Sequence, residues 1–308
     1  MQAIVKLEGG FDLRTVAVPR PKQPHDVVVR VAYAGICRTD VAVAEGRIPT
    51  RTPLVLGHEF SGVVDAVGSA VTRVAPGDRV TAMPVHDCGA CLGCRDKLDT
   101  CEFPSMLGVD HDGAFAESVR LPERLVYEVP DELDLQTAAY AEPVAACLAV
   151  AKAAIRPDQR GAVVGNNRIG ELTRRVLAAV GFPSVTTIDP LELREHETSS
   201  LDFVIEASVD TDLFRELVRL VRPRGRIVLK SRTPALVGIS LPDLLRKEIT
   251  LEAVNYGSFQ QGVDLLASGA LDVADLFGAV HPLSRFRSAF EAERRAESKK
   301  LFFRPDAG

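Results

Sequence analysis

Several signatures of common protein classes are missing from this chain of 308 residues. No stretch reaches the 18 or more apolar residues of a membrane-spanning helix, and residues 1–7 alternate like a strand instead of leading into an apolar signal core. Basic residues are not in excess, since the formal net charge is -5 and the Lys and Arg clusters are short. We therefore expect neither a membrane nor a nucleic acid as partner, because an anionic partner requires a concentrated basic face.

Cysteine is also scarce, and its placement favours metal binding over disulfides. Four of the six cysteines lie within fourteen residues: Cys88, Cys91, Cys94 and Cys101. A fifth, Cys37, precedes a histidine–glutamate pair, and the sixth, Cys147, lies in an apolar run. Thiolates available to a metal fit a reducing compartment, so we place the protein in the cytoplasm.

The four clustered cysteines predict a closed, structural zinc site. Four thiolates satisfy the tetrahedral preference of zinc and leave no position for a substrate. Gly89 and Gly93 lie between them and permit the tight turns that direct the sulfurs to one point. We expect this ion to stabilise an exposed lobe and to have no part in catalysis.

A second ligand set is typical of an open, catalytic zinc site. Cys37, His58 and Glu59 provide sulfur, nitrogen and oxygen, and Glu142 is a fourth candidate. A thiolate and one carboxylate cancel the two charges of zinc, so we predict one of Glu59 and Glu142 as ligand and the other nearby. Zinc with an open position lowers the pKa of a bound alcohol.

Two neighbours of Cys37 have predicted roles in the same site. The hydroxyl of Thr39 would pass the alcohol proton outward, and Asp40 would orient His58 through a hydrogen bond. The catalytic residues expected from the sequence are therefore those of this constellation: Cys37, Thr39, Asp40, His58 and Glu59.

The hydrophobic period changes near residue 136. Before it, short alternating runs cut by Gly and Pro indicate an all-β module; after it, an Ala-rich helix over 137–154 is expected. Strands and helices then alternate from 161 to 230, which predicts a parallel, doubly wound α/β sheet.

The turn after the strand at 161–164 predicts a nucleotide site. Gly165 and Gly170 occupy the first and last positions of G-x-G-x-x-G, whereas Asn167 replaces the middle glycine. The helix that starts near Ile169 offers its N-terminus to a phosphate, and Arg168 would add positive charge.

Asp189 follows the next strand, where an acidic side chain accepts both ribose hydroxyls and repels a 2'-phosphate. This position favours NAD over NADP, although Arg194 keeps NADP open as an alternative. Only residues 190–200 separate Asp189 from the following strand. A unit of about 30 residues, one strand and its helix, is therefore predicted to be missing.

The motifs together resemble one family. They occur in order as GICRTD at 35–40, GHE at 57–59, GDRV at 77–80, CGxC at 88–91 and GAFAE at 113–117. The chain is similar to zinc-dependent medium-chain alcohol dehydrogenases over nearly its whole length, and Glu142-Pro143 resembles their polyol, sugar and threonine dehydrogenase branch.

This resemblance implies a GroES-like β-domain, a Rossmann domain and NAD(P)-linked oxidation of an alcohol. We expect domains at 1–140, 141–280 and 281–308, the last returning to the first, with the Rossmann domain shortened by one strand–helix unit. Arg38 would contact the pyrophosphate as in some relatives. Segments 225–230 and 236–240 resemble strands at subunit contacts, which suggests a homodimer or homotetramer.

Three hypotheses follow. The first is an NAD- and zinc-dependent dehydrogenase that interconverts an alcohol and a carbonyl compound: a polyol, sugar derivative, cyclitol or amino alcohol. The second keeps zinc as a Lewis acid in a lyase or isomerase without hydride transfer, because of Asn167 and the shortened nucleotide half. The third is a non-catalytic nucleotide-binding or scaffold protein.

Overall fold

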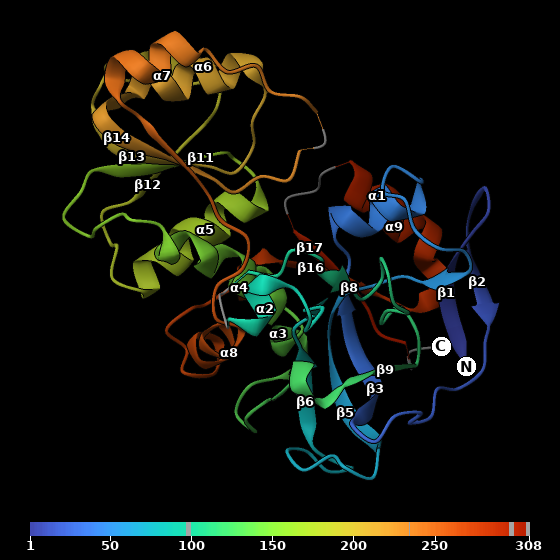
Figure 1. The fold of residues 1–308 in the computed structure, drawn as a ribbon. Coiled ribbons are helices and arrows are strands. Elements are labelled where there is room, and N and C mark those ends of the chain that lie inside the picture. The colour runs from blue at the N-terminus through green and yellow to red at the C-terminus, as the bar shows by residue number, and fades with distance from the viewer. Residues whose placement is uncertain (97–99, 234, 296–298, 306–308) are drawn as a thin grey trace. The chain divides into compact units, whose positions relative to one another are not determined.

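The computed structural model describes residues 1–96, 100–233, 235–295 and 299–305. The chain forms two compact units, one of Met1–Glu142 with Val273–Gly308 and the other of Pro143–Asp272 (Figure 1). Among the described residues, no helix combines the length and the apolar character needed to cross a bilayer.

The first unit is built on three β-sheets. The largest has the order β10-β6-β5-β3-β17-β16, with β9 also paired to β3, and the others are β2-β1-β4 and β7-β8. Its strands are β1 (Gln2–Leu7), β2 (Gly10–Thr15), β3 (Asp26–Gly35), β4 (Leu54–Val55), β5 (Glu59–Val67), β6 (Arg79–Ala82), β7 (Val85–His86), β8 (Ser105–Met106), β9 (Ser118–Pro122), β10 (Val126–Glu128), β16 (Phe277–His281) and β17 (Lys300–Phe303).

Short helices complete this unit: α1 (Arg38–Ala44), α2 (Leu92–Arg95), α3 (Leu135–Ala138) and α9 (Phe286–Arg294). The C-terminal segment returns to the N-terminal β-module, as expected, because β17 pairs antiparallel with β3 at Phe302–Gly35 and Phe303–Ala34. The core beside this junction is aromatic, with Phe115 packed edge-on against Phe303. The last residues of β3 and of β17 thus lie side by side. The N–H of Ile36 donates to the carbonyl oxygen of Leu301, which places the start of β17 next to the residues that follow β3.

The second unit is a parallel sheet covered by helices on both faces. Its strand order is β12-β11-β13-β14-β15, with strands β11 (Gly161–Val164), β12 (Thr186–Ile188), β13 (Leu201–Glu206), β14 (Val221–Leu229) and β15 (Thr250–Ala253). All four pairings are parallel. This order is that of a doubly wound sheet without its third strand, so β12 is an edge strand, and the predicted loss of one strand–helix unit is confirmed.

Helices α6 (Thr211–Leu220) and α7 (Leu241–Lys247) lie on one face of this sheet and α5 (Arg168–Ala179) on the other (Figure 1). Alternate residues of the strands supply the two cores: Val164 and Val204 face the layer of Leu217, whereas Val163 and Ile205 face the layer of Leu177. Because both of its faces are buried, the central strand β11 is apolar throughout. Helix α8 (Phe259–Ala267) completes the unit.

The prediction of a single helix over 137–154 is wrong. The segment forms α3 up to Ala138, then α4 (Ala141–Leu148), then a short 3₁₀ turn at Ala149–Lys152. Pro143 explains the break, because proline lacks an N–H and its ring clashes with the carbonyl four residues earlier. It is tolerated only in the first turn of a new helix, which is where it lies in α4.

Candidate metal centres and nucleotide site

His58 is held by the turn that follows β3. Cys37 is the N-cap of α1, and its backbone N–H donates to Asp40 Oδ2 at 2.8 Å. The other oxygen of Asp40 lies 3.0 Å from His58 Nδ1, and both side chains are buried. This contact fixes the imidazole and leaves Nε2 as the nitrogen that can bind a metal.

A sulfur, a nitrogen and an oxygen converge beside Asp40. The ligand atoms of Cys37, His58 and Glu59 all lie within 4.8 Å of one another. Burial disfavours the imidazolium, but the charges of Asp40 and Cys37 outweigh burial and raise the pKa of His58 well above its usual value. Negative groups around a buried nitrogen are the environment that a divalent cation satisfies. The donor set therefore fits zinc.

Lys300 is a buried partner of Glu59 that the sequence reasoning missed. The ammonium group of Lys300 forms an ion pair with Glu59 Oε2, and the side chain is 1% exposed. Its Nζ lies 5.9 Å from the centre of the Tyr140 ring. Gly35 makes room for the pair, because a Cβ there would lie 2.6 Å from Glu59 Oε2. The only sequence signal was a lysine that directly precedes an apolar strand run.

The two oxygens of Glu59 have different surroundings. Oε2 faces Lys300, whereas Oε1 lies 4.0 Å from His58 Nε2. Burial raises the pKa of Glu59, Lys300 opposes that rise, and the charge of Glu142 adds to it. Glu142, in the first turn of α4, is also buried but is not one of the three converging ligands.

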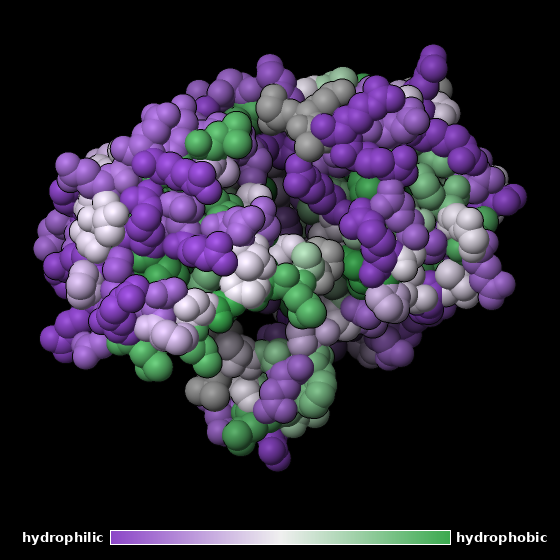
Figure 2. Space-filling model, turned by 90° about the horizontal axis from the view of Figure 1, so that it is seen from above, coloured by the Kyte–Doolittle hydropathy of each residue, from purple (hydrophilic) through white to green (hydrophobic). Residues whose placement is uncertain are grey.

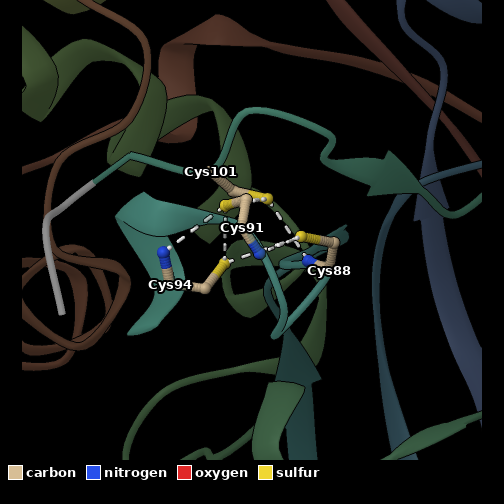
Figure 3. A group of neighbouring side chains, drawn as sticks. All are labelled: Cys88, Cys91, Cys94 and Cys101. Atoms are coloured by element: carbon tan, nitrogen blue, oxygen red, sulfur yellow. Dashed lines mark hydrogen bonds between the residues drawn. The ribbon is translucent and has the colours of Figure 1, made fainter. Parts of the chain in front are cut away.

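The four cysteines of the predicted structural site do meet at one point. Figure 3 shows the sulfurs of Cys88, Cys91, Cys94 and Cys101 directed toward one another. Three of the distances between sulfurs are 3.9 Å (88 to 94), 3.4 Å (91 to 94) and 4.0 Å (91 to 101). A tetrahedral zinc ion with Zn–S bonds of about 2.3 Å requires sulfurs roughly 3.8 Å apart. The spacing therefore fits zinc, and all six cysteines of the chain are free of disulfides.

Local backbone groups prepare these thiols for a cation. The N–H groups of Ala90 and Cys91 point at the sulfur of Cys88 and lower its pKa to about 6. By contrast, the hydrogen bond from the neighbouring Cys91 raises the pKa of Cys94 to about 12. Sulfurs this close repel one another as thiolates, and a bound divalent ion removes that conflict.

Gly93 provides a test of the structural site. A Cβ on Gly93 would lie 2.1 Å from the backbone oxygen of Thr100, so Gly93→Ala must push apart the segments that carry Cys94 and Cys101. We expect this variant to contain about one zinc ion per chain instead of two, measured by elemental analysis. Leu92→Ala, at an exposed neighbour, is the matched control and should keep both ions. Equal metal content in the two variants would contradict this assignment.

The predicted nucleotide turn lies between β11 and α5. Gly165 has φ +145, and a Cβ on Gly170 would lie 2.4 Å from the Gly165 oxygen, so both glycines are required by the tight turn. Asn167 is the N-cap of α5, and Arg168 and Ile169 begin that helix. The turn therefore has the strand–turn–helix geometry of a phosphate site.

Asp189 follows the end of β12, at the same sheet edge as the turn. Its Oδ2 accepts from Asn166 Nδ2 at 2.7 Å, and its Oδ1 accepts from the N–H of Leu191 at 2.9 Å. Arg194 points elsewhere, since its Nε lies 3.8 Å from Glu216. Arg38 is an exposed residue of α1 in the first unit, whereas the turn and Asp189 belong to the second.

Comparison with known proteins gives the family. The model of the alcohol dehydrogenase GroES-like domain matches residues 23–131. A probable D-xylulose reductase A of Aspergillus clavatus is 30% identical, over 92% of this chain and 90% of its own length. This chain belongs to the zinc-containing medium-chain alcohol dehydrogenase family.

Other relatives of this dehydrogenase cover nearly its whole length. L-threonine 3-dehydrogenase of Bacillus velezensis is 29% identical over 99% of both chains. A solved structure from Sinorhizobium meliloti 1021, described as a zinc-binding dehydrogenase with NADP bound, has a TM-score of 0.90 and 27% identity over 99% of both chains. The expected family, the GroES-like domain and the Rossmann-like sheet are therefore confirmed.

Proposed function

We propose that this dehydrogenase transfers a hydride between NAD(H) and a hydroxylated small molecule of the polyol, sugar, cyclitol or amino-alcohol class. The convergence of Cys37, His58 and Glu59 carries the proposal, because a thiolate, an imidazole and a carboxylate are ligands of an open catalytic zinc site. The substrates named for relatives, D-xylulose and L-threonine, support this class.

We assign Cys37, His58 and Glu59 as the residues that hold the catalytic zinc, with Glu142 nearby. Glu59 is favoured over Glu142 because Oε1 of Glu59 lies toward His58 Nε2 while Lys300 holds Oε2. When bound, zinc lowers the pKa of an alcohol, which helps the alcohol give up its proton. Cys88, Cys91, Cys94 and Cys101 hold the second, structural ion.

The protein's own groups position the ligands and move the proton. Asp40 keeps His58 in one orientation through the contact at Nδ1. Oxidation removes a proton from the alcohol oxygen and a hydride from its carbon, which leaves a carbonyl. Thr39 lies with Oγ1 3.7 Å from Cys37 Sγ and is half-buried, so its hydroxyl can accept the alcohol proton while its own proton leaves toward solvent.

The second unit, Pro143–Asp272, is assigned as the nucleotide-binding unit. Residues 165–170 supply the phosphate turn, and Asp189 supplies the ribose contact. The acidic side chain and the pairing of Arg194 with Glu216 favour NAD over NADP. NAD, when bound, would supply the nicotinamide ring as hydride acceptor. We propose Arg38 as a contact to its pyrophosphate.

Calorimetry and absorbance test this function. We expect zinc-loaded protein to bind NADH and to reduce NAD when supplied with xylitol or L-threonine, measured as reduced-nicotinamide absorbance. Protein denatured by heat is the control. Absence of binding for both NADH and NADPH would contradict the proposal.

A Lewis-acid lyase or isomerase is the second candidate. It is favoured by one observation, the side chain of Asn167 that lies across the first turn of α5 where a phosphate would approach. The two candidates differ in their need for nucleotide. Conversion of a hydroxylated substrate with no added nucleotide and no absorbance change would support the lyase or isomerase and remove the dehydrogenase.

We further propose a homodimer or homotetramer in the cytoplasm, where free thiols remain available to zinc. The prediction of a strand at 236–240 is wrong, because this segment is irregular. The other segment, 225–230, lies mostly in β14, which is paired on both sides, so neither segment presents a free strand edge. Four exposed apolar side chains lie in residues 236–245, the last two of them in α7: Leu236, Ile239, Leu241 and Leu245. They adjoin a groove of about 270 Å³ lined by Phe214, Val218 and Ile239.

The exposed apolar residues of the described chain are concentrated in this segment. On the face drawn in Figure 2, hydrophilic residues predominate and hydrophobic residues form smaller groups. Leu236 is 100% and Leu245 77% exposed, which a second copy of the chain would bury. We expect Leu236→Glu with Leu245→Glu to convert the oligomer to monomer in light scattering. Leu191→Glu, at an equally exposed leucine elsewhere, should leave the mass unchanged, and a monomeric parent protein would contradict the proposal.

A further inference from the structure

The side chain of Asn167 closes the N-terminus of α5. Its Oδ1 accepts from the N–H of Gly170 at 2.9 Å, and its Nδ2 donates to the carbonyl oxygen of Ala207 at 3.1 Å. The backbone of Asn167 is extended, with φ -105 and ψ 169. Both ends of the amide are therefore satisfied by the protein itself, and the side chain bridges α5 and the end of β13.

This position is the one at which a diphosphate would approach the protein. A helix N-terminus attracts anions through its free N–H groups and its partial positive charge. At the middle position of the motif, the absence of a side chain normally lets the backbone approach the pyrophosphate. Here an uncharged amide fills that volume and uses one N–H group of the first turn.

The adjacent amide restrains the ribose contact in a similar way. Asn166 donates to Asp189 Oδ2 at 2.7 Å, while the N–H of Leu191 occupies Oδ1. A ribose hydroxyl must therefore compete with an existing hydrogen bond. The two asparagines contact different groups. Asn166 donates to the carboxylate of Asp189, whereas Asn167 accepts from a backbone N–H at the N-terminus of α5.

We propose that Asn167 limits the affinity of the nucleotide site by occupying the diphosphate position at the N-terminus of α5 in the free protein. The proposal rests on the proposed function, since it requires a dinucleotide as ligand. Binding must first displace the amide from Gly170 and then replace its hydrogen bond with one from a phosphate oxygen. The affinity for NADH is thereby reduced by the free energy of the bond that is broken.

The test is a titration of the full-length, zinc-loaded protein with NADH and with ADP-ribose, by calorimetry. We expect Asn167→Gly to tighten the binding of both ligands by up to about tenfold, the upper end of the net contribution of one neutral hydrogen bond. Asn167→Ala should also tighten binding, by a smaller factor, because it removes the amide without adding backbone freedom. Asn255→Gly, the same change at an exposed residue outside the phosphate turn, is the matched control and should alter either Kd by less than about threefold.

The possible outcomes distinguish failure of this inference from failure of the proposed dehydrogenase function. Equal or weaker binding by Asn167→Gly, with the parent protein still binding NADH, would overturn the inference alone, because the amide would then be neutral or a ligand. Tightening by Asn167→Gly with no tightening by Asn167→Ala would overturn it as well, since backbone flexibility of the turn, and not removal of the amide, would explain that result. If neither parent nor variants bind NADH or ADP-ribose, the proposed function fails and the inference with it.

Discussion

Replacement of Cys37 by serine is expected to abolish dehydrogenase activity and to halve the zinc content. The serine hydroxyl stays protonated near neutral pH, so one of three ligands and its negative charge are lost. We expect one zinc ion per chain in place of two, and a decrease in kcat/KM of roughly 10³-fold or more. Elemental analysis and the rate of reduced-nicotinamide formation measure the two effects.

Cys147 provides the matched control for this substitution. It is buried in α4, outside both ligand groups, and its sulfur accepts a hydrogen bond from Thr173 Oγ1 at 3.4 Å. Cys147→Ser keeps a group that can accept this bond, so zinc content and kcat/KM should stay near those of the parent protein. Retention of both ions and of activity in Cys37→Ser would rule out Cys37 as a catalytic ligand.

Lys300→Met is expected to have the largest effect on stability. The ammonium group is fully buried and neutralises Glu59, which is also buried. Methionine has a similar shape, but it leaves a carboxylate in the interior without its positive partner. Loss of one member of a buried pair costs about 3 kcal/mol or more. Urea denaturation of the purified protein should show this decrease in the free energy of unfolding.

Two further variants separate charge from packing. Lys299→Met makes the same change at the exposed neighbouring residue and should shift the free energy of unfolding by less than about 0.5 kcal/mol. Combining Lys300→Met with Glu59→Gln removes both charges and should recover a large part of the loss. If Lys300→Met were as mild as Lys299→Met, the ion pair would not be a stabilising feature of the metal centre.

The sequence patterns predicted most of the second unit. Strands at 161–164 and 201–207 and a helix from about Ile169 were expected from hydrophobic periodicity, and the structure has them at 161–164, at 201–206 and from Arg168. The short segment 190–200 revealed the missing strand–helix unit. The predictions failed at two segments. The Ala-rich run suggested one long helix, but a single proline restarted it at Ala141. At 236–240, resemblance to relatives suggested a strand, yet no strand pairs with this segment in the described part of the chain.

The ligands of both metal groups could be identified from the sequence, because metal chemistry restricts the residue types and their spacing. Cysteines three residues apart reach a common ion through local turns, and Cys37 with GHE at 57–59 is a constellation with few other uses. The side chains that hold these ligands in place were harder to predict from the sequence. Asp40 could be assigned to His58 because it lies within the same motif, whereas Lys300 is remote in sequence from Glu59.

The sequence by itself therefore determined the family, the two ligand groups and the order of strands and helices, since these depend on residue type and short-range spacing. Only the tertiary structure decided that Lys300 pairs with Glu59 and that Asn167 covers the start of α5. The first depends on the register of β17 against β3, and the second on a side-chain torsion selected by the carbonyl of Ala207. Neither the register between distant strands nor the choice of rotamer is encoded in a local pattern, because both result from packing of the whole unit.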